Sequence, residues 1–177
     1  MLFSSGNIIG IVDSFGIELI HPRREGRSEK QIGMKGLSNH RWIVGAKLCL
    51  MIDCTGRVID FDYDSANVYD GDFSRILSSY EDKTGFLSDL GFRCKVNQPT
   101  NLVPCKRGEG KPRWLIETVL GQLCTYFHLK RSRARTWLGL EWRLYAALAC
   151  YNLVREIHEV TDPETGYVSI SLQEFAF

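Results

Sequence analysis

The stretch RWIVGAKLCLMIDCTGRVIDFDYDSA, residues 41–66, carries the strongest structural signal in this chain. Its first half, residues 41–53, is rich in apolar and β-branched residues and predicts a strand. Residues 54–57, Cys-Thr-Gly-Arg, have the chemistry of a turn. Residues 58–66 then alternate apolar and acidic side chains, as a half-buried strand does. The stretch therefore predicts an antiparallel hairpin.

Two further apolar runs predict strands, and each leads to an isolated aspartate. The β-branched run in NIIGIVDSFGIELI, residues 7–20, is expected to end near Asp13, with a return or loop after it. Residues 86–88 predict a short strand that enters Asp89. Residues 21–37 are basic, Gly-rich and weakly patterned, which predicts an exposed loop.

Apolar residues at helical spacing predict three helices. A short amphipathic helix is expected within residues 70–83, with Asp70 or Asp72 as its N-cap, and two longer ones over residues 113–130 and 136–158. Residues 90–112 hold three prolines and are expected to be irregular. This order predicts the α/β class, a mixed sheet flanked by helices. One domain over 1–160 and a short tail over 161–177 account for the chain.

The composition is ordinary for a globular protein. No run of about 18 apolar residues indicates a membrane span, and the N-terminus lacks the basic region of a signal peptide, so we expect a cytoplasmic protein. The six cysteines are scattered without a Cys-x-x-Cys pair. This favours buried reduced thiols, with Cys49 and Cys150 inside apolar segments, over a disulfide framework or a zinc site.

The net charge of +1 conceals an uneven distribution of charge along the chain. Residues 21–47 hold seven Lys/Arg against two Asp/Glu, residues 53–89 hold three against nine, and residues 106–135 hold eight against two. Each block alone is explained by a solvated charged face. Basic blocks on both sides of an acidic one also suit the binding of a polyanion around a metal centre.

Three carboxylates stand in settings that suggest a metal site: Asp13 and Asp89 at strand ends, and Glu117 on the apolar-periodic start of a helix. Divalent cations such as Mg²⁺ prefer oxygen ligands, and two of them about 4 Å apart can stabilise both the attacking and the leaving oxygen of a phosphodiester. Each residue also has an ordinary explanation. The aspartates suit turns, and a glutamate is unremarkable at the edge of an apolar face.

Other acidic residues compete for the same role. A solvated face or a turn explains a group on the predicted hairpin and after it, comprising Asp53, Asp60, Asp62, Asp64 and Asp70. Asp82 is a closer rival of Asp89 because it lies 35 residues before Glu117, a spacing familiar from retroviral integrases. The polar surroundings of Asp82 indicate a helix end, whereas Asp89 follows an apolar strand and precedes Gly91-Phe92. We therefore prefer Asp89.

Five phrases, taken together in their order, carry a resemblance to a known family. They are IVDSFGIEL, RWIVGAKLCLMIDCTGRVIDFDYDSANVYD, LSDLGFRC, WLIETVLGQL and LYAALACYNLV. The chain resembles the catalytic domain of DDE-type bacterial insertion-sequence transposases over residues 8–158. The matching positions are Trp42, Gly45, Lys47, Gly56, Asn67, Val68, Asp70, Asp89, Gly91 and Phe92.

The resemblance implies a ribonuclease-H-like fold in which Asp13, Asp89 and Glu117 hold two Mg²⁺ or Mn²⁺ ions. It implies cleavage of a DNA strand at an element end, followed by attack of the freed 3′-hydroxyl on target DNA. Six basic residues are then expected to contact DNA: Arg23, Arg24, Arg27, Lys47, Lys130 and Arg131. Lys47 is equally explained as a structural lysine. A homo-oligomer on bacterial nucleoid or plasmid DNA is expected, with neither a membrane nor a small-molecule substrate as partner.

Relatives in that family usually carry a DNA-binding region before the first catalytic aspartate, and this chain starts about a dozen residues before Asp13. A truncated copy or a partner-dependent fragment is therefore expected. One alternative is an inactive remnant or a nuclease-like DNA-binding domain of the same fold. The other is a non-enzymatic interaction domain whose acidic strands are merely solvated.

Overall fold

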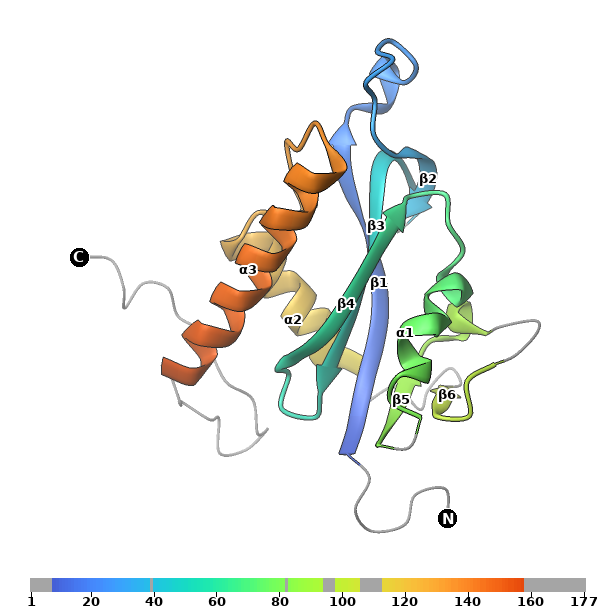
Figure 1. The fold of residues 1–177 in the computed structure, drawn as a ribbon, viewed down its shortest axis with the longest axis vertical. Coiled ribbons are helices and arrows are strands. Elements are labelled where there is room, and N and C mark those ends of the chain that lie inside the picture. Colours follow the sequence, from blue (N-terminus) through green and yellow to red (C-terminus); the bar gives the residue numbers. More distant parts are fainter. Residues whose placement is uncertain (1–7, 39, 82, 94–97, 106–112, 158–177) are drawn as a thin grey trace.

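The computed structural model describes residues 8–38, 40–81, 83–93, 98–105 and 113–157 of the 177-residue chain. Within these ranges the chain forms a six-stranded mixed sheet (Figure 1). Helices α2 (Arg113–Tyr126) and α3 (Trp137–Ile157) cover one face, and the short helix α1 (Ser74–Ser78) lies on the other. This confirms the predicted α/β class. The tail at 161–177 lies outside the described residues.

The six strands are β1 (Ile8–Ile20), β2 (Met34–Ser38), β3 (Arg41–Asp53), β4 (Val58–Ser65), β5 (Thr84–Ser88) and β6 (Leu102–Pro104). Their order is β2-β3-β1-β5-β6, and β4 also pairs with β3. Strand β3 is antiparallel to β1, β2 and β4, whereas β5 is parallel to both β1 and β6. Thus β2 pairs with the first part of β3, and β4 pairs with the rest.

The predicted hairpin is confirmed, since β3 spans residues 41–53 and pairs antiparallel with β4. Asp53 organises the turn. Its Oδ1 accepts hydrogen bonds from the backbone N–H of Thr55 at 2.8 Å and of Arg57 at 2.9 Å. Gly56 supplies the positive φ of 86° that the turn requires, a conformation that glycine adopts without strain.

Two predictions about the N-terminal third are wrong. Strand β1 does not end near Asp13 but continues to Ile20, because its residues from Gly10 onward pair with β3. Residues 21–37 are not all loop either, since they contain the 3₁₀ turn η1 (Pro22–Arg24) and most of β2. Strand β2 is an exposed edge strand in which only Gly36 is buried. Its sequence therefore lacks the apolar alternation that would have revealed it.

The helices begin and end differently from the predictions. The predicted short helix is split into the 3₁₀ turn η2 (Asp70–Phe73) and α1. Tyr69 and Phe73 occupy the two N-cap positions, and neither Asp70 nor Asp72 is a cap. Helix α2 ends at Tyr126 rather than near residue 130, and the 3₁₀ turn η4 (Leu129–Arg131) follows. His128 has a left-handed φ of 53°, which an α-helix cannot contain. Helix α3 begins within one residue of its predicted start, and it continues to Ile157, the last described residue.

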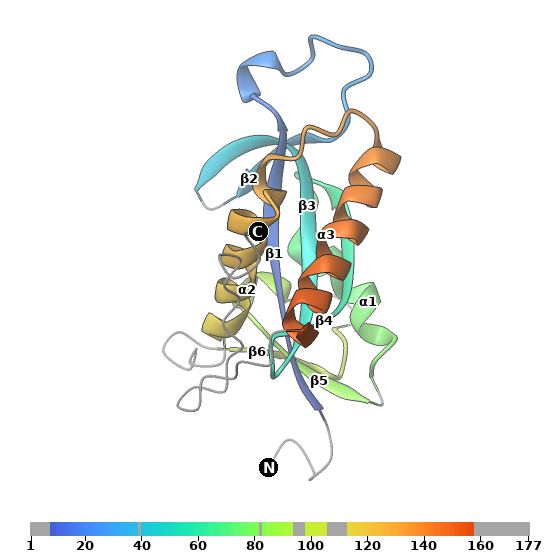
Figure 2. The same cartoon turned by 90° about the vertical axis from the view of Figure 1, so that its left-hand side faces the viewer.

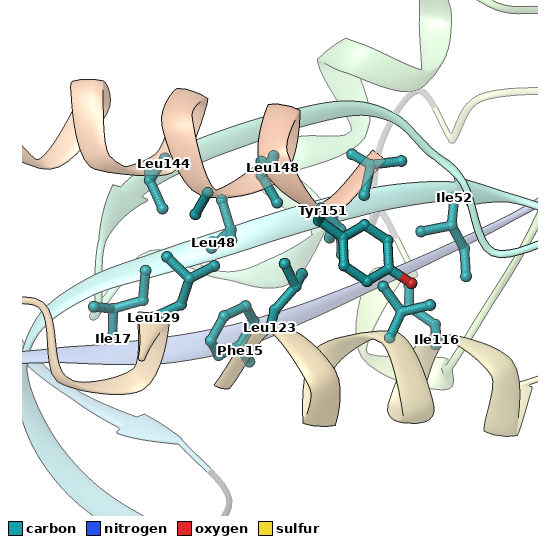
Figure 3. Close-up of a cluster of buried hydrophobic side chains, with 14 of the residues drawn as sticks. Phe15, Ile17, Leu48, Ile52, Ile116, Leu123, Leu129, Leu144, Leu148 and Tyr151 are labelled. Atoms are coloured by element: carbon teal, nitrogen blue, oxygen red, sulfur yellow. The ribbon is translucent and has the colours of Figure 1, made fainter. Parts of the chain in front are cut away.

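Apolar side chains form a core on each face of the sheet. The larger core joins β1 and β3 to α2 and α3 through residues such as Phe15, Leu48, Leu123 and Tyr151 (Figure 3). The smaller core lies under α1 and includes Phe73. Full burial of one such side chain contributes about 2–3 kcal/mol. These two cores hold β1 and β3 from both sides, and so they fix the strands that carry the site.

Within the described residues, no helix is both long and apolar enough to cross a membrane. The cysteines only partly follow the prediction of burial. Cys49 is fully buried and Cys124 is half-buried, but Cys54 and Cys150 are exposed. Cys150 lies on the outer side of α3, so the apolar segment around it does not bury it. Cys94 lies outside the described residues.

Candidate active site

The three predicted carboxylates line a single pocket of about 490 Å³. Asp13 comes from β1, Asp89 directly follows β5, and Glu117 lies in the first turns of α2. The structure therefore brings residues from three separate elements to one opening in the surface. Asp13 and Asp89 are half-buried, and Glu117 is exposed.

The pairing of β1 with β5 explains why Asp13 and Asp89 meet. The two strands are parallel, and the last pair in the ladder is Ile11 with Leu87. Asp13 and Asp89 each lie two residues beyond this pair. The backbone of Asp89 is still extended, with φ −79° and ψ 178°. Neighbouring strands lie about 4.8 Å apart. The two aspartates are therefore neighbours at the carboxyl end of β5.

Packing on the opposite side of the pocket positions Glu117. Side chains at every second residue of a strand point to the same face, so Asp13 shares a face with Phe15. Phe15 belongs to the core that includes the fully buried Ile116 of α2. Glu117 is the next residue of that helix and lines the pocket. The packing of this core therefore places the start of α2 beside Asp13.

A fourth carboxylate, that of Asp70, also lines this pocket. A Cβ atom built on Gly91 would lie 2.9 Å from Oδ1 of Asp89 and 3.2 Å from Oδ2 of Asp70. Both carboxylates therefore approach the same point beside Gly91, whose N–H already donates to Asp89 Oδ1 at 2.8 Å. Any side chain at position 91 would press on both oxygens.

Asp70 is held by two neighbours inside the pocket. Its Oδ1 accepts a hydrogen bond from the hydroxyl of Ser14 at 2.5 Å and lies 3.0 Å from Nζ of Lys47. The Lys47 ammonium also donates to the carbonyl oxygen of Val68 at 2.6 Å. Asp70 is thus a structural and pocket-lining residue, and the prediction of a solvated face is wrong for it. In the sequence, Asp70 belongs to the phrase Asn67-Val68-x-Asp70. Lys47 of β3 connects this phrase to the sheet, because it contacts both Val68 and Asp70.

The remaining acidic competitors have partners away from the pocket, and Asp64 Oδ1 accepts a hydrogen bond from the backbone N–H of Ser65 at 2.6 Å. Asp53 caps the hairpin turn, as described above. Asp60 Oδ2 accepts a hydrogen bond from the hydroxyl of Tyr80 at 3.1 Å, and Asp62 pairs with Arg75 at 2.8 Å. Asp82, the predicted rival of Asp89, lies outside the described residues.

The carboxylates in and near the pocket affect the buried thiol of Cys49. Cys49 lies opposite Ser14 in the pairing of β1 with β3. Burial raises the pKa of the Cys49 thiol well above its ordinary value, and the negative charges of Asp62, Asp13 and Asp70 raise it further. Burial and these carboxylates together hold the Cys49 thiol in its neutral form.

The donor chemistry of the pocket suits a hard divalent cation, since its acidic side chains offer only carboxylate oxygens. In the described residues, no three His, Cys, Asp or Glu side chains are yet close enough together to form a ready-made ligand set. Asp70 and Asp89 both lie beside Gly91. Asp13, Asp89 and Glu117 could supply ligands to a metal in this pocket, with Asp70 beside them.

The predicted DNA-contacting residues separate into three places. Lys47 and Lys130 line the carboxylate pocket. Lys130 and Arg131 of η4 line a smaller adjoining hollow, and Arg24 and Arg27 line a third depression at the far end of β1. Arg23 is exposed on η1. Of these side chains, that of Lys47 is the most enclosed, with 12% of its surface exposed.

Comparison with protein-family models, curated proteins and solved structures finds no match for this chain.

Proposed function

We propose that this chain is the catalytic domain of a DNA transposase that cleaves and transfers DNA strands with the help of divalent metal ions. The observation that carries the proposal is the meeting of Asp13, Asp89 and Glu117 around one pocket. Their resemblance to a DDE triad rested on the order and setting of the three residues and on the phrases around them, and none of these requires the three elements to converge. A shared pocket is the minimum that such a triad needs.

The strand arrangement supports the finer fold assignment that the resemblance implies. Strand β1 lies at the centre of the sheet, antiparallel to β3 on one side and parallel to β5 on the other. The first two carboxylates lie on β1 and just after β5, and the third lies on a helix that covers the sheet. This arrangement is consistent with the ribonuclease-H-like fold that we propose.

The residues of the pocket have separate tasks in the proposed reaction. Asp13, Asp89 and Glu117 would hold Mg²⁺ or Mn²⁺, which stabilises the charge that develops on phosphate oxygens. Ser14 and Asp70 fix the backbone and side chains next to Asp13 and Asp89 through the contacts described above. Lys130 is exposed at the rim of the pocket, where it can bind a phosphate of the DNA strand.

Metal-dependent cleavage of DNA by the full chain tests this proposal. The substrates are a supercoiled plasmid, which reports nicking, and labelled duplexes that carry the DNA on either side of the gene, which report cleavage and joining. Replacement of Asp89 by Asn should remove several kcal/mol of transition-state stabilisation, which lowers the rate by more than about a hundredfold. The same loss is expected for Asp13→Asn and Glu117→Gln.

Asp72→Asn is the matched control, because Asp72 is exposed on η2 and does not line the pocket. Its cleavage rate should equal that of the wild type. Unchanged cleavage by Asp89→Asn would refute the site assignment. Nicking without joining would support a nuclease instead of a transposase. Titration with Mg²⁺ alone should raise the melting temperature of the wild type but not that of Asp89→Asn.

A further inference from the structure

A second depression lies at the far end of β1 from the carboxylates, with a volume of about 840 Å³. One wall comes from the loop between β1 and β2, and the other from the connection between η4 and α3. Figure 2 shows these two segments at the same end of the sheet. We call this depression the basic groove, after the side chains that line it: Arg24, Arg27, Lys30, Arg133 and Arg135.

The basic groove is unbalanced in charge. Its lining contains these five cationic side chains and no carboxylate. All five are exposed, and in the described part of the chain none of them forms a salt bridge. Glu25 and Glu29 lie in the same loop, but neither lines the groove, and Glu25 pairs with Lys35 of β2 at 3.7 Å. Five unpaired cations at one depression attract a polyanion rather than a single small anion.

Basic side chains also connect the groove to the carboxylate pocket. Lys130 lines the pocket and, together with Arg131, the smaller hollow beside it, where Arg41 is paired with Glu18. That hollow also contains Glu18 of β1, and the next residue along the strand, Leu19, lines the basic groove. The three depressions therefore follow one another along β1, from Asp13 towards its C-terminal end.

The distance along this path can be expressed as a length of duplex DNA. Seven residues of β1 separate Asp13 from Ile20 at the basic groove, which is about 23 Å at ~3.3 Å per residue. At ~3.4 Å per base pair, this corresponds to about seven base pairs. The groove is therefore far enough from the carboxylates to hold the duplex flanking a cleavage point while the pocket holds the reacting phosphate.

From these observations we infer that the basic groove binds the phosphate backbone of duplex DNA, about seven base pairs from the reacting phosphate. Arg133 and Arg135 supply one wall of this site, and Arg24, Arg27 and Lys30 supply the other. The inference rests on the proposed function for the identity of the polyanion. It joins Lys30, Arg133 and Arg135 to Arg24 and Arg27, which were already expected to contact DNA, in one binding site. This site is separate from the carboxylates and needs no metal.

Binding of a fluorescein-labelled duplex of about 30 base pairs, measured by anisotropy in EDTA, tests the inference. EDTA prevents cleavage, so the result does not depend on the carboxylate pocket. The double variant Arg133→Gln/Arg135→Gln should bind more weakly than the wild type. Between about 50 and 200 mM salt, its slope of log K against log salt should be less steep by about 1.8, since each lost phosphate contact changes the slope by ~0.9.

The matched control is Arg57→Gln/Arg75→Gln, which removes two exposed arginines elsewhere on the surface. Its slope should equal that of the wild type, and circular dichroism should show both double variants folded. An unchanged slope for the groove variant, or an equal change in the control, would overturn the inference. The inference would also be overturned if the groove variant lost binding to an acidic peptide such as poly-glutamate but still bound DNA as the wild type does. The groove would then bind an acidic protein segment. If DNA binding behaves as expected while cleavage is absent, the groove stands and the proposed reaction fails.

Discussion

Breaking the ion pair between Lys47 and Asp70 should destabilise the protein more than breaking the pair between Arg75 and Asp62. The two pairs have similar geometry, with N–O distances of 3.0 Å and 2.8 Å. They differ in exposure. The cation of the first pair has 12% of its side-chain surface exposed, and that of the second has 64%. The two carboxylates are similarly enclosed, with 27% and 20% exposed, so burial of the cation is the main variable that separates the pairs.

The expected magnitudes follow from this difference in burial. Removal of the Asp70 carboxylate leaves the enclosed Lys47 ammonium with its hydrogen bond to the carbonyl oxygen of Val68. We expect a cost of about 3 kcal/mol for Asp70→Ala, at the lower end for a broken buried pair because Asp70 retains some contact with water. The coupling energy of the pair should be about 2 kcal/mol. The Arg75–Asp62 pair should couple by about 0.5 kcal/mol, as exposed pairs do.

Two double-mutant cycles, measured by urea unfolding, give these coupling energies. The first uses Lys47→Met and Asp70→Ala, and the second uses Arg75→Met and Asp62→Ala. Each cycle cancels the loss of other contacts, such as the hydrogen bond from Ser14 to Asp70. Equal coupling energies in the two cycles would refute the reasoning from burial. A rise in salt concentration should weaken the coupling of the exposed pair more than that of the enclosed one.

Three further predictions concern single side chains. Gly91→Ala should lower metal-dependent cleavage with little change in melting temperature, because its Cβ would lie 2.9 Å from Oδ1 of Asp89. Burial raises the pKa of Tyr151 to about 12, so the unfolded chain loses this phenolic proton first. The stability advantage of the wild type over Tyr151→Phe, from urea unfolding, should therefore hold below about pH 10 and shrink as pH rises towards 12. A thiol reagent followed by mass spectrometry should modify exposed Cys54 readily and leave the buried Cys49, whose pKa is raised, intact until unfolding.

Local signals explain the parts of the fold that the sequence predicted well. The hairpin of β3 and β4 follows from a buried apolar run, a turn that Asp53 and Gly56 organise, and an alternating strand. All of these signals lie within about 25 residues and act independently of the rest of the chain. Helix α3 was predicted for the same reason, because its apolar periodicity is long and uninterrupted.

Signals from distant partners explain the misses. Strand β2 exists because β3 offers it an edge to pair with, and its own residues are mostly exposed. Helix α2 was extended too far because the buried Leu129 continues the apolar spacing through η4. His128 adopts the left-handed backbone conformation after the helix. A glycine at this position would have predicted that conformation from the sequence, but a histidine does not.

Asp70 shows the limit of assigning each residue by its own neighbourhood. Its surroundings in the sequence are polar, which suggested a solvated residue. Its partners Ser14 and Lys47 lie on β1 and β3, 56 and 23 residues away along the chain. Only the sheet brings them together. A pairing between the phrases that contain Lys47 and Asp70 could be suspected from the sequence, but its geometry could not.

Asp13 was selected because it was expected at the end of a strand, and the structure changes that reason while keeping the residue. Asp13 lies in the middle of β1, but the neighbouring parallel strand β5 stops beside it at Ser88. In open sheets with parallel strands, ligands bind in the crevice beyond the carboxyl ends of those strands. The remainder of β1 continues past that crevice, paired with β3, as far as the basic groove. The length of β1 beyond β5 therefore does two things: it opens the carboxylate pocket at Asp13, and it sets the separation between that pocket and the proposed DNA-binding groove.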